Sequence, residues 1–267
     1  MRDDRENDMG SDAVQSVGRA IRLLRLVCGR RGGAARLSEL ISEGGLNKPT
    51  THRLLKQLVQ SGMLMQARDH RYYLGPTALE LGYSADHGFP IRERAAPVLA
   101  EIARVTEDSV FLVVRVGWDS LCVARHMGAY PVKVFTVEPG HRQPMGVGAA
   151  GLAMLAALPA HEQELALNAI EPQLVRYPRL TAERLRSLIE VTRSKGWSAA
   201  SDVAIEGVSA VGVPLLDRTG MPFAALSVGA VSLRMTKARG AYVAAMLIEH
   251  AKTLENSLLD SFQVEPE

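Results

Sequence analysis

The sequence has few residues of the kinds that hold secreted or membrane proteins together. Its 267 residues include only two cysteines, Cys28 and Cys122, and two isolated thiols are too few for a disulfide framework or a zinc site. No apolar run approaches the ~20 residues that a transmembrane helix requires, and residues 1–12 are charged where a signal peptide is apolar. We therefore expect a cytoplasmic protein with no membrane contact and no bound metal, in which both cysteines are core thiols.

Motifs of the common enzyme classes are also absent. The sequence contains no H-E-x-x-H, no G-x-S-x-G and no P-loop, and its seven histidines are scattered with no acid or cysteine at catalytic spacing. Residues 146–151 match the dinucleotide pattern G-x-G-x-x-G, but the helix expected there is followed by another helix rather than by a strand that ends in an acid. We expect no catalytic residues and no cofactor, although a triad assembled in space would escape this search.

What the sequence does have is an uneven distribution of charge over a globular composition. Hydrophobic residues make up 47% and charged residues 22% of the chain, and 267 residues usually form two domains. Residues 13–76 hold eleven of the 31 basic residues but only three of the 29 acidic residues. A basic first segment is typical of a DNA-binding domain joined to a domain with another role. A basic surface without a nucleic-acid role is the alternative.

The apolar spacing in this basic segment predicts three helices. Apolar residues recur with helical spacing over residues 16–28 and again, more briefly, from Leu37 to a stop at Gly44-Gly45. A third helix is expected after the N-cap residue Asn47, ending at Gly62. Two helices joined by a tight turn are the order of a helix-turn-helix motif.

The third predicted helix has an apolar side, which includes Val59 and Thr51, and an opposite side centred on Arg53. Thr51 is therefore expected to pack in the core. Residues 63–75 alternate like a hairpin around a polar turn, which predicts the wing of a winged helix. We expect base-edge contacts from Thr50, Arg53 and Gln57, and phosphate contacts from Lys48, Lys56, Arg68 and Arg71.

The rest of the chain predicts an α+β domain on an antiparallel sheet. A helix continues over residues 77–87, and Gly88-Phe89-Pro90 marks a domain boundary. Beyond it, the pattern predicts strands at 109–116, 121–125, 132–137, 208–216 and 222–230, and helices at 91–106, 147–157, 161–169, 181–195 and 237–259. Strand pairs joined by short turns favour antiparallel pairing over a doubly wound fold.

Several stretches together carry a family resemblance. They are QSVGRAIRLLRLV, LSELISEGGLNKPTTHRLLKQLVQSGML, YYLGPTALELG, GVGAAGLAMLAALP, Gly196-Trp197 and GVSAVGVPLLDRTGMPFAALSVGA. From about Val14 to Leu258 the chain resembles the IclR family of bacterial transcriptional regulators. The resemblance implies a winged helix-turn-helix domain at 13–76, a linker helix at 77–89 and a GAF-like effector-binding and oligomerisation domain at 90–260. A disordered tail at 1–12 and a second tail at 261–267 complete the expected organisation.

The resemblance also implies an effector pocket in the second domain. The family's pocket positions fall on Phe135, Ala149, Ala150, Val208, Ala210, Ser227 and Gly229. An acidic position of the family falls on Ala200, and a family histidine is replaced by Gly146, so the pocket is more apolar than in family members that hold small keto acids. A mostly apolar pocket suits an aromatic or medium-sized organic acid, and the glycines before the helix at 147–157 leave free amides that attract a carboxylate.

We therefore expect a ligand-responsive transcriptional regulator that binds operator DNA as a homodimer or homotetramer. Because one winged helix buries little surface, two copies reading two half-sites are required for useful affinity. One alternative is a DNA-binding protein whose second domain only dimerises. Another is a small-molecule enzyme with an appended DNA-binding domain.

Overall fold

The computed structural model describes residues 4–30, 32–88 and 90–259. The chain divides into two compact units, Met1–Phe89 and Pro90–Glu267. Over the described ranges, no helix is both long and apolar enough to span a bilayer, and no three potential metal ligands gather in one place. The tail expected at 261–267 lies outside the described residues.

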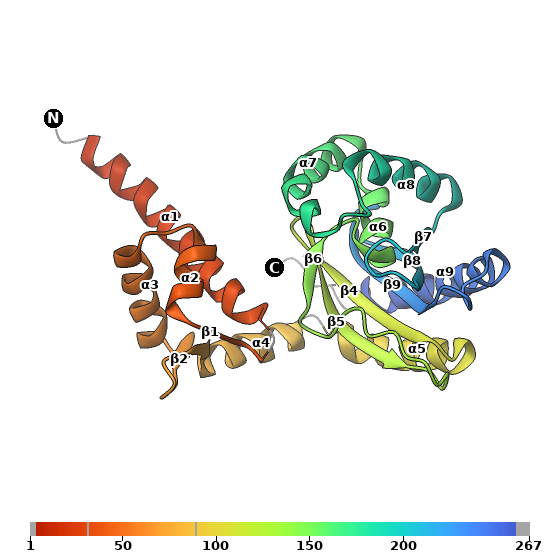
Figure 1. The fold of residues 1–267 in the computed structure, drawn as a ribbon, viewed down its shortest axis with the longest axis horizontal. Helices are drawn as coiled ribbons and strands as arrows, with labels where there is room; N and C mark the ends of the chain where they lie inside the picture. The colour runs from red at the N-terminus through yellow and green to blue at the C-terminus, as the bar shows by residue number, and fades with distance from the viewer. Residues whose placement is uncertain (1–3, 31, 89, 260–267) are drawn as a thin grey trace, which may run out of the picture. The chain divides into compact units, whose positions relative to one another are not determined.

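The first unit is a winged helix-turn-helix, as expected. Its elements are α1 (Asp4–Cys28), β1 (Ala34–Ala35), α2 (Leu37–Gly44), α3 (Lys48–Gln60), β2 (Leu64–Gln66), β3 (Tyr72–Leu74) and α4 (Pro76–Gly88) (Figure 1). Leu23, Leu40, Leu55 and Leu64 are fully or almost fully buried in one cluster, so one core joins the first three helices and the hairpin. The hairpin gains β1 as a third strand, in the order β1-β3-β2.

Helix α1 begins well before the expected start at residue 16. The structure is helical from Asp4, whereas residues 1–12 were expected to form a disordered tail, of which residues 1–3 lie outside the described part. Apolar spacing set the expected start, and such spacing reports burial rather than helicity. Cys28 corrects a second expectation, because it is exposed while Cys122 is buried.

Two glycines determine how the wing leaves helix α3. Gly62 has a φ of +71°, and a Cβ at Gly75 would lie only 2.1 Å from the carbonyl oxygen of Gly62. Only a residue without a side chain permits this approach of the two backbones. The amide of Gly75 donates to the carbonyl of Met63 at 2.9 Å, which closes the base of the hairpin.

The second unit is built on one antiparallel sheet, in the strand order β6-β5-β4-β9-β8-β7. Its strands are β4 (Ser109–Val116), β5 (Asp119–Met127), β6 (Arg142–Pro144), β7 (Ser198–Ser201), β8 (Val208–Leu216) and β9 (Pro222–Val231). Its helices are α5 (Ile91–Thr106), α6 (Gly148–Ala157), α7 (Ala160–Ile170), the 3-10 helix η1 (Glu171–Arg176), α8 (Ala182–Lys195) and α9 (Lys237–Leu259). The expected α+β class is confirmed.

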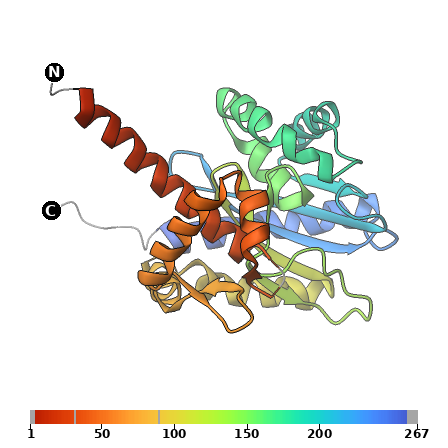
Figure 2. The same ribbon diagram turned by 60° about the vertical axis from the view of Figure 1, so that its left-hand side comes forward.

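Helices cover both faces of this sheet. Helices α5 and α9 lie on one face, and α6, with α7 and α8 beyond it, lies on the other (Figure 1, Figure 2). Along β8 the side chain of Val211 approaches Gly240 of α9, while Gly212 approaches Ala149 of α6. Successive residues of one strand therefore pack against opposite layers.

The strands at the two edges differ from expectation. Residues 132–137 form no strand, although their alternation predicted one. Val134 is buried and Phe135 exposed, so the alternation reports an extended segment with one buried side and does not require a neighbouring strand. Instead β6, at residues 142–144, pairs with β5, and β7 pairs with β8.

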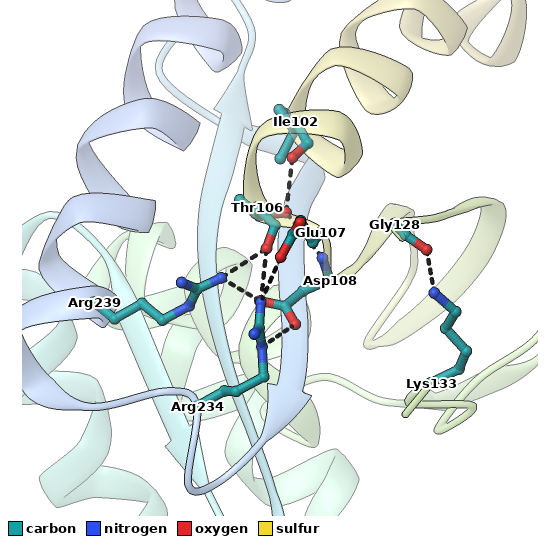
Figure 3. A network of polar contacts seen from close by, with 8 residues as sticks. All are labelled: Ile102, Thr106, Glu107, Asp108, Gly128, Lys133, Arg234 and Arg239. Carbon is teal, nitrogen blue, oxygen red and sulfur yellow. Dashed lines mark hydrogen bonds and ion pairs between the residues drawn. The ribbon is translucent and has the colours of Figure 1, made fainter. Parts of the chain in front are cut away.

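An ion-pair network closes one end of the sheet (Figure 3). Asp108, at the start of β4, is buried and accepts from Nε of Arg234 at 3.0 Å and from Nη2 of Arg239 at 2.8 Å. Both arginines also donate to the carbonyl of Thr106, and the guanidinium of Arg234 lies 3.8 Å from the ring centre of Tyr130. The network ties the end of α5 to β4 and to the beginning of α9.

Candidate functional site

The start of helix α3 is set by its cap. The Asn47 side chain accepts from the amide of Thr50 at 2.9 Å. Thr51 is buried and its hydroxyl donates to the carbonyl of Asn47 at 3.0 Å, so the expectation that Thr51 packs in the core is confirmed. Val59 was expected on the buried side but is 37% exposed, so the buried side of α3 is narrower than its apolar side.

The outward side of α3 carries several positive charges around a shallow hollow. Lys48, Pro49, His52, Arg53 and Lys56 line it. The three basic side chains among them are exposed, and no carboxylate within the described residues pairs with any of them. Unpaired cations on one helix face are what a phosphate backbone attracts.

The two other residues expected to reach base edges lie outside this hollow. Thr50 is half-buried, and its amide is already bonded by the cap. Gln57 is exposed, and its amide nitrogen donates to the side chain of Gln60 at 3.0 Å. Of the three expected base contacts, Arg53 is therefore the one that lines the hollow.

The two arginines of the wing have different surroundings. Arg68 is exposed and has no partner within the part of the chain that the structure describes. The guanidinium of Arg71 lies 3.6 Å from the carboxylate of Asp69. The backbone amide of Arg71 also donates a hydrogen bond to that carboxylate, at 3.1 Å. Part of the charge of Arg71 is thus neutralised within the wing.

A further exposed arginine, Arg36, was not anticipated. Continuing the register of β1 and β3 brings Arg36 opposite Arg71. The pKa of Glu39 is lowered, first by the hydrogen bond from the amide of Arg36 and then by the charges of Arg30, Arg36 and Arg71. A two-residue strand leaves no periodic signal, so the sequence alone could not pair Arg36 with the wing.

The second unit encloses a cavity of about 260 Å³ against the inner face of its sheet. Six of the seven residues expected in the effector pocket line it: Ala149, Ala150, Val208, Ala210, Ser227 and Gly229. These residues come from the start of α6 and from strands β8 and β9. The structure therefore brings together residues that lie up to 80 positions apart in the chain.

Small residues in register create the hollow. Ala200 pairs with Ala210, and Ala210 pairs with Gly229, so a row across three strands has almost no side-chain volume. Beside this row a Cβ at Gly212 would lie 2.8 Å from the carbonyl carbon of Ala149. Helix α6 can therefore begin directly on the sheet, at the edge of the cavity.

The turn into α6 leaves backbone amides open toward this region. Gly146 and Gly148 have φ values of +89° and +72°, and the Gln143 side chain donates to the carbonyl of Val147 at 2.8 Å. The first amides of an α-helix have no acceptor within the helix. The strand before this turn, β6, runs antiparallel to β5, and α7 follows α6, so the glycine pattern does not belong to a βαβ unit.

Ser227 places a polar group in the wall of the cavity. It is 5% exposed, and its hydroxyl has no hydrogen-bond partner among the described residues. The hydroxyl oxygen is not among the fully buried unpaired polar atoms of the described residues, so it is accessible from the cavity. Ser227 is therefore available to bind a ligand group.

Phe135 is not part of the cavity, contrary to expectation. It is 60% exposed, and the guanidinium of Arg125 lies 4.9 Å from its ring centre. Its neighbours Thr136 and Val137 line the cavity instead. Val134 faces the core and Phe135 faces away from it, as neighbouring side chains of an extended segment do. The bend at Thr136 ends this alternation, so Thr136 and Val137 both face the cavity.

Other walls of the cavity were not anticipated. Phe111 and Val113 of β4 contribute to it, and Phe111 is the cross-strand neighbour of Ser227. Tyr177 lines it from the segment after η1, and burial raises the pKa of its hydroxyl. Phe111 could not be predicted from the sequence, because its place in the wall depends on the pairing of β4 with β9 and no local pattern indicates that pairing.

Comparisons with known proteins agree with this geometry. The model of the bacterial transcriptional regulator IclR C-terminal domain matches residues 84–256, and that of the IclR helix-turn-helix domain matches residues 16–68. The chain is 31% identical over 222 residues to a glycerol operon regulatory protein of Streptomyces coelicolor, covering 82% of this chain and 85% of that protein. It is 28% identical over 208 residues to the HTH-type transcriptional regulator KipR of Bacillus subtilis, covering 78% and 83%.

Solved structures share the fold. A putative IclR transcriptional regulator from Silicibacter sp. TM1040 superimposes with a TM-score of 0.81 at 24% identity, over 91% of this chain and 96% of that one. An IclR homolog from Microbacterium hydrocarbonoxydans, crystallised as a complex with 4-hydroxybenzoate, has a TM-score of 0.69 at 23% identity, over 91% and 98%. At these identities the likeness concerns the fold.

Proposed function

Because the chain belongs to the IclR family of bacterial transcriptional regulators, we propose that it binds operator DNA with residues 13–76 and a small organic acid with residues 90–260. In this proposal residues 77–89 link the two domains, and the protein acts in the cytoplasm. The cavity on the sheet carries the proposal, because a domain that only dimerised would not need a hollow lined by small side chains with an unpaired hydroxyl, that of Ser227, in its wall. The matched relatives with printed functions are regulators, and we propose no catalytic role.

The DNA contacts in this proposal follow from charge and exposure. Arg53 reaches base edges, because it is the longest donor on the outward side of α3. Lys48 and Lys56 flank it and neutralise phosphates, and Arg68 does the same from the wing. Thr50, Gln57 and Arg71 remain secondary contacts, since each has groups already engaged within the unit.

The ligand contacts follow from the cavity wall. The carboxylate of the acid accepts from the open amides at residues 148–150 and from the Ser227 hydroxyl, and it gains from the helix dipole. Val208 and Ala210 surround the carbon skeleton. The complex of the Microbacterium homolog with 4-hydroxybenzoate supports an aromatic acid as one such ligand.

Calorimetry on cavity variants tests this assignment. Ala150→Leu fills the space beside the helix start, and Ser227→Ala removes the hydroxyl, so each should weaken binding of benzoate or 4-hydroxybenzoate. Ala245→Leu, on the exposed side of α9, makes the same change away from the cavity and should leave binding unaltered. Wild-type affinity in both cavity variants would place the ligand elsewhere.

Self-association is the remaining part of the proposal. Helix α4 has no buried residue within the described part of its unit, and Leu79 and Tyr83, one turn apart on it, are 77% and 67% exposed. Val17 and Ile21 are likewise exposed on α1. A regulator that reads two half-sites needs two copies, and we propose that these apolar faces contribute to a dimer, which could pair further into a tetramer.

A further inference from the structure

The side chains around the proposed effector cavity carry almost no charge. Among the described residues that line it, none is Lys, Arg, Asp or Glu. His141 and Tyr177 are the titratable groups there. His141 is exposed, so water screens any charge on it, and burial raises the pKa of Tyr177, which keeps its hydroxyl neutral. A charged group inside the cavity therefore meets no side-chain countercharge.

Two arginines beside the lining are engaged elsewhere, while Arg176, which precedes Tyr177, is exposed to water. Arg142 lies between two lining residues in sequence, but its guanidinium pairs with Asp119 at 2.6 Å and donates to the carbonyl of Val116 at 3.1 Å. Arg125 donates to the carbonyl of Val137 at 3.1 Å and stacks on Phe135. Moving either cation into the cavity would break these contacts.

The groups that can stabilise a negative charge are few and lie on neighbouring elements. The first amides of α6 provide the equivalent of about half a positive charge. The hydroxyl of Ser227, a buried residue, has no partner among the described residues and adds a donor from β9. Together they suffice for the two oxygens of one carboxylate.

We propose that the cavity is selective for organic acids with a single negative charge and excludes dianions of the same size and shape. This inference rests on the proposed effector-binding role of the cavity. A second carboxylate would find no cation in the lining, only neutral donors such as the hydroxyls of Thr136 and Tyr177. Neutral donors compensate a buried charge less well than they compensate a neutral amide, which can both accept and donate. The selectivity thus comes from what the lining lacks.

Two aromatic acids that differ only in charge provide the test. Terephthalate carries two carboxylates, whereas 4-carbamoylbenzoate has a neutral amide in place of one of them. Calorimetry with the full-length protein should show 4-carbamoylbenzoate binding at least about tenfold more tightly than terephthalate. Benzamide, which has no charge, should bind more weakly than benzoate, because the helix amides favour an anion.

An added charge at the rim should relax this selectivity. His141→Lys places a permanent cation on an exposed lining residue, where folding is not at risk, and should tighten terephthalate binding roughly two- to fivefold. His161→Lys adds the same charge at an exposed position of α7 that does not line the cavity, and should change nothing.

Terephthalate binding as tightly as 4-carbamoylbenzoate would overturn the proposal. Failure of all four compounds to bind at millimolar concentration would overturn it as well. In either case DNA binding, measured on the same protein, decides the wider question separately. If the protein still binds DNA, only the proposed ligand class is wrong. If it does not bind DNA, the proposed function as a regulator is contradicted.

Discussion

Arg53 tests the proposed DNA interface with a single side chain. It lies opposite the buried residues of α3 and has no ion-pair partner in the described ranges. A bidentate contact between arginine and a base contributes roughly 1–3 kcal/mol of discrimination. We expect Arg53→Ala to lower the ratio of specific to non-specific DNA affinity by roughly 5- to 150-fold. The free energy of unfolding should stay the same. Fluorescence anisotropy on selected and scrambled duplexes measures this ratio, and an unchanged ratio would remove Arg53 from base recognition.

The surrounding cations should differ in the salt dependence they contribute. Lys56 and Arg68 have no carboxylate partner in the described structure, whereas Arg71 is paired with Asp69. Replacing Lys56 or Arg68 by Ala should flatten the slope of log affinity against log salt by about one unit each. Arg71→Ala should flatten it less, because Asp69 already neutralises part of the charge. Equal losses for Arg68 and Arg71 would show that Arg71 leaves Asp69 when DNA binds.

Some single residues could be placed from the sequence, and others could not. Periodicity identified Thr51 as a core residue, because a helix repeats its faces every few residues. It could not exclude Phe135 from the cavity, since that depended on which side of an irregular segment faces the core. Arg36 was missed because its place beside Arg71 depends on pairing across a two-residue strand.

Among the elements, the network around Asp108 joins α5, β4 and α9. Its carboxylate is buried between Arg234 and Arg239, so Asp108→Ala leaves Arg239 without a carboxylate and Arg234 with only the exposed Glu107, 3.6 Å away. Breaking such a pair costs about 3 kcal/mol, and the free energy of unfolding of the second unit should fall by that amount in a denaturant titration. Glu164→Ala removes an exposed ion pair with Arg186 and should cost less than about 1 kcal/mol. Similar losses in the two variants would contradict a structural role for the network.

Helix α4 makes a different prediction, because its apolar side has no partner within the described part of its unit. Replacing Leu79 and Tyr83 by Ser should weaken binding to a duplex with two half-sites, while binding to one half-site stays the same. Val175→Ser, which alters an equally exposed residue of the second unit, serves as the control. An unchanged preference for two half-sites would place the dimer contacts on another element.

The order of helices and central strands was predictable, whereas the edges of the large sheet were not. Apolar residues recur regularly over α9, β8 and β9, and the bounds predicted for these three elements agree with the structure. Strands β6 and β7 have three and four residues, which is too short for alternation to register. The cavity wall was therefore predicted in part, since β8, β9 and α6 were anticipated and the contribution of β4 depended on strand order.

At the scale of the whole molecule, the proposed regulation requires that ligand binding to the second unit and DNA binding to the first unit influence each other. Occupancy of the cavity must change the affinity for DNA, and by thermodynamic linkage DNA must change the affinity for the acid by the same factor. The family's resemblance covers both units, but the size and sign of this coupling depend on differences between two states of the protein.

The most direct test is an anisotropy titration of a duplex selected from a random library, with and without 4-carbamoylbenzoate. It compares the wild type with the double variant Ala150→Leu and Ser227→Ala. We expect the acid to change the wild-type affinity for DNA by at least about fivefold. The variant should bind the duplex equally well in its absence and ignore the acid. A variant that responds like the wild type, or a wild type that does not respond, would contradict the claim that this cavity controls DNA binding.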